Sequence, residues 1–181
     1  MAAAADALSG SRLLIAAALP GVLSAVGARG SWLPLGLVAV AALTDFLDGV
    51  AARRSAGGPS RHGAVLDNVA DLGLVVGCTG AGAVLGLVPA AVPIAIAAAF
   101  ACYVLASATR TVHEGAWRLA RTRLGHAAGV LNYGIAGLVA AAVAAPAPLW
   151  QPALDVASLI VVAVNLAAIL DRLPAWRGRP R

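Results

Sequence analysis

The sequence predicts an all-α membrane protein, a bundle of six transmembrane helices whose N- and C-termini both face the cytoplasm. Its composition is the first reason. Hydrophobic residues make up 61% of the 181 residues and charged residues only 12%, whereas soluble domains carry about 25% charged residues. The mean hydropathy of +0.88 agrees. We therefore expect one membrane domain, residues 1–181, and no soluble surface for nucleic-acid binding.

The number of apolar windows is the second reason. A spanning helix needs about 20 mostly apolar residues. Six windows approach or meet this length: residues 13–28, 32–52, 63–85, 90–107, 124–143 and 150–170. An even number of spans puts both termini on one side of the membrane.

The distribution of arginine is the third reason. All 13 basic residues are Arg, and with six spans twelve of them fall on the same side, with Arg29 on the other. Because positive residues favour the cytoplasmic side, this side and both termini are predicted to be cytoplasmic. The connections at 86–89 and 144–148 carry no charge and fit the outer side.

Four aspartates interrupt this apolar pattern around one predicted turn. Asp45 and Asp48 are three residues apart near the end of the second window, and Asp67 and Asp71 are four apart near the start of the third. Each pair therefore shares one helix face, and the short connection lets all four carboxylates converge at one depth. The alternative of four solvated loop acids is disfavoured by the apolar residues in helical register between them.

Placing several carboxylates together in a membrane costs free energy, and the carboxylates also repel one another. Protonation or arginines could relieve this cost, but a divalent cation is the natural partner. Oxygen ligands without His or Cys favour Mg²⁺, Mn²⁺ or Ca²⁺. Four carboxylates are enough for two ions.

The same stretch resembles a family signature. Residues 45–71 read DFLDGVAAR, then nine residues, then GAVLDNVAD. This is similar to the CDP-alcohol phosphatidyltransferase pattern D-x2-D-G-x2-A-R-x8–9-G-x3-D-x3-D at every fixed position. The opening residues 6–12, DALSGSR, resemble the looser N-x-L-T-x-x-R start of many members, with Asp6 and Ser9 as substitutions.

The resemblance implies an enzyme that transfers a phosphatidyl group from CDP-diacylglycerol to an alcohol and releases CMP. It implies that Asp45, Asp48, Asp67 and Asp71 hold Mg²⁺ or Mn²⁺, two ions in all, and that Asp71 is also the catalytic base. Binding of the CDP-lipid donor is expected from six further residues: Ser11, Arg12, Gly49, Ala52, Arg53 and Gly63.

The alcohol acceptor is less well specified. Five cationic or titratable residues gather in or near the second cytoplasmic connection and suit a phosphorylated acceptor: Arg110, Arg118, Arg121, Arg123 and His126. The alternative is positive-inside topology with anionic lipid contact. Glycerol 3-phosphate is the first candidate acceptor, with inositol phosphate, phosphatidylglycerol and serine as alternatives. Members that use glycerol phosphate often read L-D-P-x-A-D-K, whereas this chain has Asn68 in place of the Pro and Leu72 in place of the Lys.

Two further expectations concern the oligomeric state and location of the protein and an alternative function. The small-residue helices and the family resemblance predict a homodimer in the bacterial inner membrane, with its active site facing the cytoplasm. Intramembrane aspartates also occur in ion carriers, so a small membrane ion carrier that uses the aspartate cluster is the alternative to an enzyme. The clustering of the four carboxylates at one face disfavours a path across the membrane.

Overall fold

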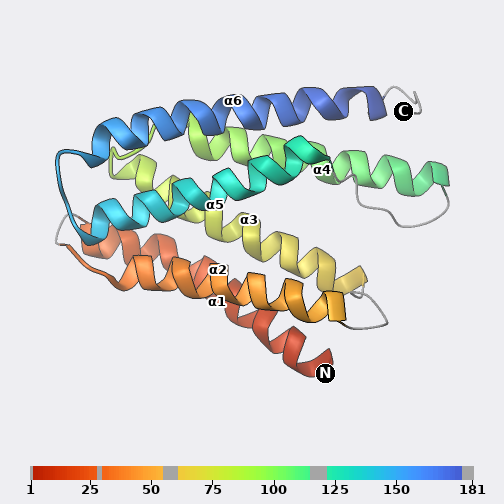
Figure 1. Cartoon of the computed structure of the whole chain (residues 1–181), viewed down its shortest axis with the longest axis horizontal. Helices are drawn as coiled ribbons and strands as arrows, with labels where there is room; N and C mark the ends of the chain where they lie inside the picture. The colour runs from red at the N-terminus through yellow and green to blue at the C-terminus, as the bar shows by residue number, and fades with distance from the viewer. Residues whose placement is uncertain (1, 28–29, 55–60, 115–121, 177–181) are drawn as a thin grey trace.

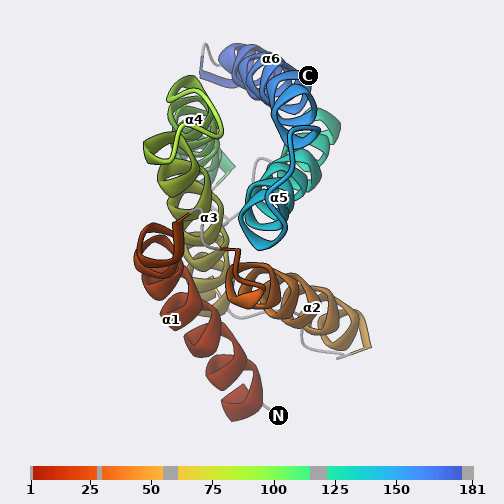
Figure 2. The same cartoon turned by 90° about the vertical axis from the view of Figure 1, so that its left-hand side faces the viewer.

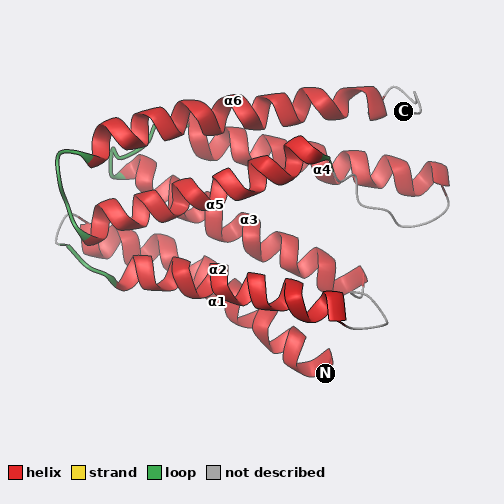
Figure 3. Ribbon diagram, in the orientation of Figure 1, coloured by secondary structure: helices red, strands yellow, loops and turns green. Residues whose placement is uncertain are grey.

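The computed structural model describes residues 2–27, 30–54, 61–114 and 122–176. Within these ranges the side chains of 2–12, 48–54, 61–67, 110–114 and 174–176 are not described. The described residues form six α-helices (Figure 1): α1 Ala2–Val26, α2 Leu33–Arg54, α3 Arg61–Val84, α4 Ala91–Glu114, α5 Arg123–Ala144 and α6 Trp150–Trp176. Figure 3 shows helices as the only regular structure among the described residues, as the sequence predicts.

The helices extend beyond the apolar windows at their polar ends. The largest difference is at α1, which begins at Ala2 rather than near residue 13. The apolar window leaves out Asp6, Ser9, Ser11 and Arg12, whereas the helix continues through them into the alanines at its start, and alanine has the highest helix propensity. The sequence therefore located each helix but underestimated its length.

Three of the helices are long and apolar enough to cross a membrane within the residues whose side chains are described: Ala91–Thr109, Arg123–Ala144 and Trp150–Leu173. In α1, α2 and α3 the apolar stretches among the described side chains are Leu13–Val26, Leu33–Leu47 and Asn68–Val84, each bounded on one side by residues whose side chains are not described. The chain is thus a membrane protein with three candidate spans. Six spans remain a prediction, because the side chains at the polar ends of α1, α2 and α3 lie outside the described ones.

The connections alternate between the two ends of the molecule. Residues 30–32, 85–90 and 145–149 lie at one end, while α1 starts and α6 finishes at the other (Figure 1). Gly86 makes the α3–α4 turn with φ 74°, a conformation that suits glycine because it has no Cβ. At the same end the Trp150 indole donates to the Ala145 carbonyl at 2.8 Å.

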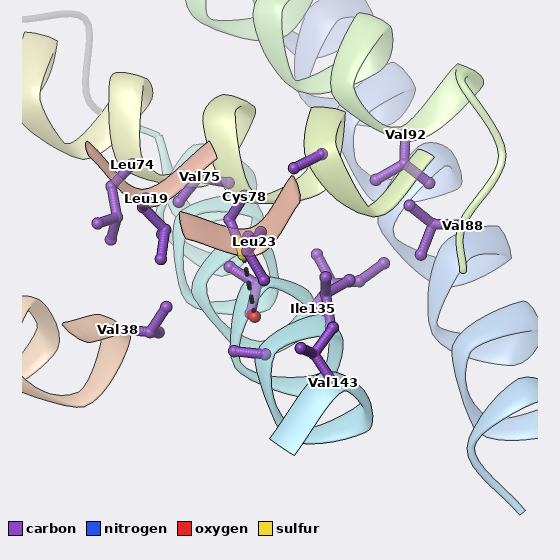
Figure 4. Close-up of a cluster of buried hydrophobic side chains, with 14 of the residues drawn as sticks. Leu19, Leu23, Val38, Leu74, Val75, Cys78, Val88, Val92, Ile135 and Val143 are labelled. Atoms are coloured by element: carbon purple, nitrogen blue, oxygen red, sulfur yellow. Dashed lines mark hydrogen bonds between the residues drawn. The ribbon is translucent and has the colours of Figure 1, made fainter. Parts of the chain in front are cut away.

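Seen end-on, α3 and α5 form a middle layer between the α1–α2 pair and the α4–α6 pair (Figure 2). Much of the buried core lies where α1, α2, α3 and α5 meet: Leu19, Leu23, Val38, Leu74, Val75, Cys78 and Ile135 are among its members (Figure 4). Cys78 donates to the Ala136 carbonyl at 3.4 Å, from α3 to α5. The middle layer is therefore fixed by direct contact between α3 and α5.

Glycine lets α1 approach α3 closely. A Cβ added at Gly77 would lie 2.8 Å from the Pro20 Cγ atom, and one added at Gly73 would lie 3.4 Å from the Ala16 Cβ. Small residues drive helix association in lipid because they let backbones approach. This packing sets the position of α3, which carries two of the four signature aspartates.

Candidate active site

The four signature aspartates lie on two helices whose polar ends are at the same end of the molecule (Figure 1). Asp45 is nine residues before the end of α2, and Asp71 is ten residues after the start of α3. At 1.5 Å per residue both lie about 15 Å from those ends. Asp48 and Asp67 are each six residues from the same ends, or about 9 Å. Counted along the helices, Asp45 and Asp71 thus lie at similar distances from these ends, and Asp48 and Asp67 lie nearer to them. The convergence of all four carboxylates at one depth stays a prediction.

The side chains of this signature are described only in part. Asp45 and Asp71 are half-buried. The side chains of Asp48 and Asp67 lie outside the described ones, and among the side chains that the structure describes there is no group of three or more acidic, His or Cys residues placed for a metal. The predicted four-carboxylate metal site therefore stays a prediction.

Asp71 accepts a hydrogen bond from another helix. The Tyr133 hydroxyl on α5 donates to Asp71 Oδ1 at 2.5 Å. Hydroxyl donors approach ionised carboxylates to about 2.5–2.7 Å, so this contact has the length of a charge-assisted bond. Sequence analysis did not select Tyr133.

A second polar contact lies beside the first. Asn165 on α6 donates to Asn132 Oδ1 at 2.8 Å, and Asn132 donates back to Asn165 Oδ1 at 3.4 Å. Asn165 also donates to the Val161 carbonyl in its own helix at 2.8 Å. Because Asn132 precedes Tyr133 in the chain, the two contacts tie neighbouring positions of α5 to α3 and to α6.

A buried arginine approaches the start of α5. The Arg172 side chain on α6 is only 7% exposed, and its Nη1 donates to the Ala168 carbonyl at 3.1 Å. Its Cζ lies 5.6 Å from the centre of the Tyr103 ring on α4, a cation–π contact. Its buried Nε finds no hydrogen-bond partner among the described residues.

Gly125 makes room for this guanidinium. A Cβ at Gly125 would lie 2.1 Å from Arg172 Nη2. Thr122 caps α5, its hydroxyl accepting from the Gly125 N–H at 3.0 Å. The positive end of the α5 dipole and the guanidinium therefore lie together, an arrangement that favours an anion.

The structure describes the predicted acceptor residues unevenly. Arg123 and His126 are exposed in the first turn of α5. Arg110 belongs to α4 but its side chain is not described, and Arg118 and Arg121 lie outside the described residues.

The predicted donor residues are described through their backbone alone. Ser11 and Arg12 are in α1; Gly49, Ala52 and Arg53 are in the last turns of α2; Gly63 is in the first turn of α3. Their contacts with a CDP-lipid stay predictions.

The residues that sequence analysis missed share one signal. Asn132, Tyr133 and Asn165 are polar groups inside apolar windows, where a buried polar group needs a partner. Arg172 was assigned only to membrane topology, because it follows the last apolar window. The polar residues within the apolar windows could therefore have been predicted to form hydrogen bonds with one another. The sequence does not specify which of them pair.

Comparison with known proteins agrees with the signature. The model of the family described as CDP-alcohol phosphatidyltransferase matches residues 2–171. Neither the curated proteins nor the solved structures gave a match. The match spans all six helices except the last turns of α6. The chain therefore belongs to the CDP-alcohol phosphatidyltransferase family, enzymes that transfer a phosphatidyl group from CDP-diacylglycerol to an alcohol.

Proposed function

We propose that the acceptor of this enzyme is an alcohol that carries a phosphate group, with glycerol 3-phosphate as the first candidate and an inositol phosphate as the second. The main support for this proposal is the buried guanidinium of Arg172, which could bind the phosphate of the acceptor. Serine carries no phosphate, and phosphatidylglycerol carries its phosphate as a lipid diester, so both rank below the first two.

The argument rests on the cost of burying a cation. Arg172 is almost fully buried, and its Nε lacks a partner in the described part of the chain. A buried polar group without a partner costs free energy, more so when charged. A phosphate can accept two parallel hydrogen bonds from one guanidinium, and the nearby α5 N-terminus favours the same charge. Arg123 and His126 lie in the first turn of that helix and would attract the anion to it.

Asp45, Asp48, Asp67 and Asp71 are the residues proposed to hold Mg²⁺ or Mn²⁺. Their chemistry fits, since carboxylate oxygens are the ligands these ions prefer. The similar numbers of residues from Asp45 to the end of α2 and from the start of α3 to Asp71 support the proposal. When bound, two such ions neutralise the charge of the pyrophosphate and of the departing CMP. Gly49, Ala52, Arg53 and Gly63 are proposed to contact the nucleotide or its phosphates, together with Ser11 and Arg12.

Asp71 is proposed as the base. It takes the proton of the acceptor hydroxyl as that oxygen forms a bond to the phosphatidyl phosphorus. The bond from this phosphorus to the CMP oxygen breaks in the same displacement, and CMP leaves. The proton stays on Asp71 until it is lost to solvent, and no covalent enzyme intermediate is needed.

The membrane arrangement is part of the proposal. We place the signature end of α2 and α3 at the cytoplasmic face of a bacterial inner membrane, with both termini on that side, because twelve of thirteen arginines lie there under six-span topology. The functional unit is proposed to be a homodimer.

The experiment compares matched pairs of acceptors. The purified protein in detergent, supplied with CDP-diacylglycerol and Mg²⁺ or Mn²⁺, is tested with glycerol 3-phosphate against glycerol, and with inositol 1-phosphate against inositol. Serine and phosphatidylglycerol complete the set. CMP release with one phosphorylated acceptor and not with its matched alcohol is expected. CMP release with serine or a non-phosphorylated alcohol alone would refute the proposed acceptor class, and no metal-dependent release with any acceptor would refute the proposed activity.

A further inference from the structure

The hydrogen bond between Tyr133 and Asp71 links residues 62 positions apart in the chain. It brings a hydroxyl donor from the middle of α5 to a carboxylate on α3. Carboxylates within membrane helices are costly, and a short charge-assisted hydrogen bond offsets part of that cost. The contact thus fixes an acidic group that the chemistry is proposed to use.

The bond restricts how the carboxylate can turn. The Asp71 backbone is held within α3, and the Tyr133 hydroxyl holds Oδ1. With these two points held, rotation about the side-chain bonds is limited, and the direction of Oδ2 is restricted as well. Carboxylates that bind metals are commonly hydrogen-bonded in turn, and these partners tune metal affinity and activity.

The donor is carried by a helix that is itself well fixed. One residue before Tyr133, the Asn132–Asn165 pair joins α5 to α6. Three residues after it, the Ala136 carbonyl accepts from Cys78 on α3, and Ile135 is buried in the core beside it (Figure 4). A positioning group is effective when its own place is set by packing and neighbouring hydrogen bonds.

We infer that Tyr133 is a positioning residue that orients the Asp71 carboxylate for metal binding and proton removal. The inference rests on the proposed function, since it assigns Tyr133 to act through the proposed base. Tyr133 touches neither substrate nor reacting atoms in this role.

The experiment replaces Tyr133 in the full-length protein in two ways. Tyr133→Phe keeps the ring and removes the donor, and 4-aminophenylalanine at position 133 restores a donor at the same ring position. Thr79→Val is the matched control, because it removes a buried hydroxyl of α3 that donates to the Val75 carbonyl at 2.7 Å, two turns from Asp71. Each variant is measured for kcat, for KM toward CDP-diacylglycerol, for Mn²⁺ affinity by electron paramagnetic resonance, and for thermal midpoint.

Tyr133→Phe is expected to lower kcat or Mn²⁺ affinity by about 10–100-fold, with KM for the CDP-lipid changed by less than about threefold. The amino variant should recover most of the loss, and Thr79→Val should lose little. If both position-133 variants fail to fold, or if Tyr133→Phe matches wild type in turnover and Mn²⁺ affinity, the inference is wrong. If the wild-type protein binds Mn²⁺ but releases no CMP, the proposed function is refuted while the inference about Tyr133 is not. The Mn²⁺ affinities of the wild type and of the position-133 variants then test whether Tyr133 orients Asp71.

Discussion

The guanidinium of Arg172 fills the space left beside Gly125 by the absence of a side chain at that position. A Cβ at position 125 would lie 2.1 Å from Arg172 Nη2 and 3.3 Å from its Cζ. Any larger residue at position 125 must therefore move the guanidinium away from the start of α5. This relationship gives a way to displace Arg172 without removing its charge.

Gly125→Ala is expected to raise KM for the phosphorylated acceptor by about tenfold or more, since hydrogen bonds to charged groups contribute about 1.5–3 kcal/mol. KM for CDP-diacylglycerol should stay near its wild-type value. Gly129→Ala is the matched control one turn later on α5, where an added Cβ meets nothing within 4 Å. Steady-state kinetics with each substrate varied in turn make the measurement. Equal effects of the two alanines on acceptor KM would contradict the assignment of Arg172.

The roles of two aspartates can be separated by metal titration. Asp71→Asn removes the proposed base and should lower turnover by about 10²–10⁴-fold. Asp48→Asn removes a metal-ligating charge but leaves the base, so raised Mg²⁺ should partly restore its rate. Initial rates of each variant are measured across Mg²⁺ concentration at fixed substrate. Recovery of Asp71→Asn to near wild-type rate at high Mg²⁺ would show that another group is the base.

The close packing of α1 on α3 should not tolerate a methyl group. Gly77→Ala places a Cβ 2.8 Å from the Pro20 ring, and overpacking of this kind costs about 1–3 kcal/mol. Gly80→Ala on the same helix has open space around its added Cβ and should cost little. Thermal unfolding in detergent compares the two variants. A midpoint for Gly77→Ala equal to that for Gly80→Ala would mean that α1 moves aside freely.

The Asn132–Asn165 pair should show energetic coupling. Hydrogen bonds between membrane helices contribute about 0.6 kcal/mol on average and up to about 1.7 kcal/mol. Asn132→Leu and Asn165→Leu each leave one amide without its partner, so the double variant should lose less stability than the sum of the two. The unfolding free energies of the wild type, the two single variants and the double variant form a double-mutant cycle that measures this coupling. Additive losses would argue that the two amides do not stabilise each other.

The proposed homodimer has a direct test. Mass measurement of the protein in nanodiscs, across a range of loading ratios, should give twice the chain mass of 17.9 kDa after the lipid and scaffold are subtracted. The faces of small residues on α3, α4 and α5 are the surface proposed to pack against the second copy. One chain per disc at every ratio would contradict it.

The sequence by itself determined the class of protein and the family to which it belongs. Apolar windows located all six described helices, because length and hydrophobicity are local properties of the chain. The signature from Asp45 to Asp71 pointed to the family that the whole-chain comparison supports, since its fixed residues lie within one stretch of two helices. The windows missed how far the helices run beyond them, most clearly at the start of α1, which begins at Ala2.

The tertiary structure decided which distant residues meet. Nothing in the spacing of Tyr133 and Asp71 predicts their contact, because it depends on how α5 packs on α3 over 62 residues of chain. The same holds for Arg172, whose place beside Gly125 and Tyr103 requires three helices at once. Periodicity specifies the face of a helix, whereas the partner of that face is fixed only by close packing among all the helices.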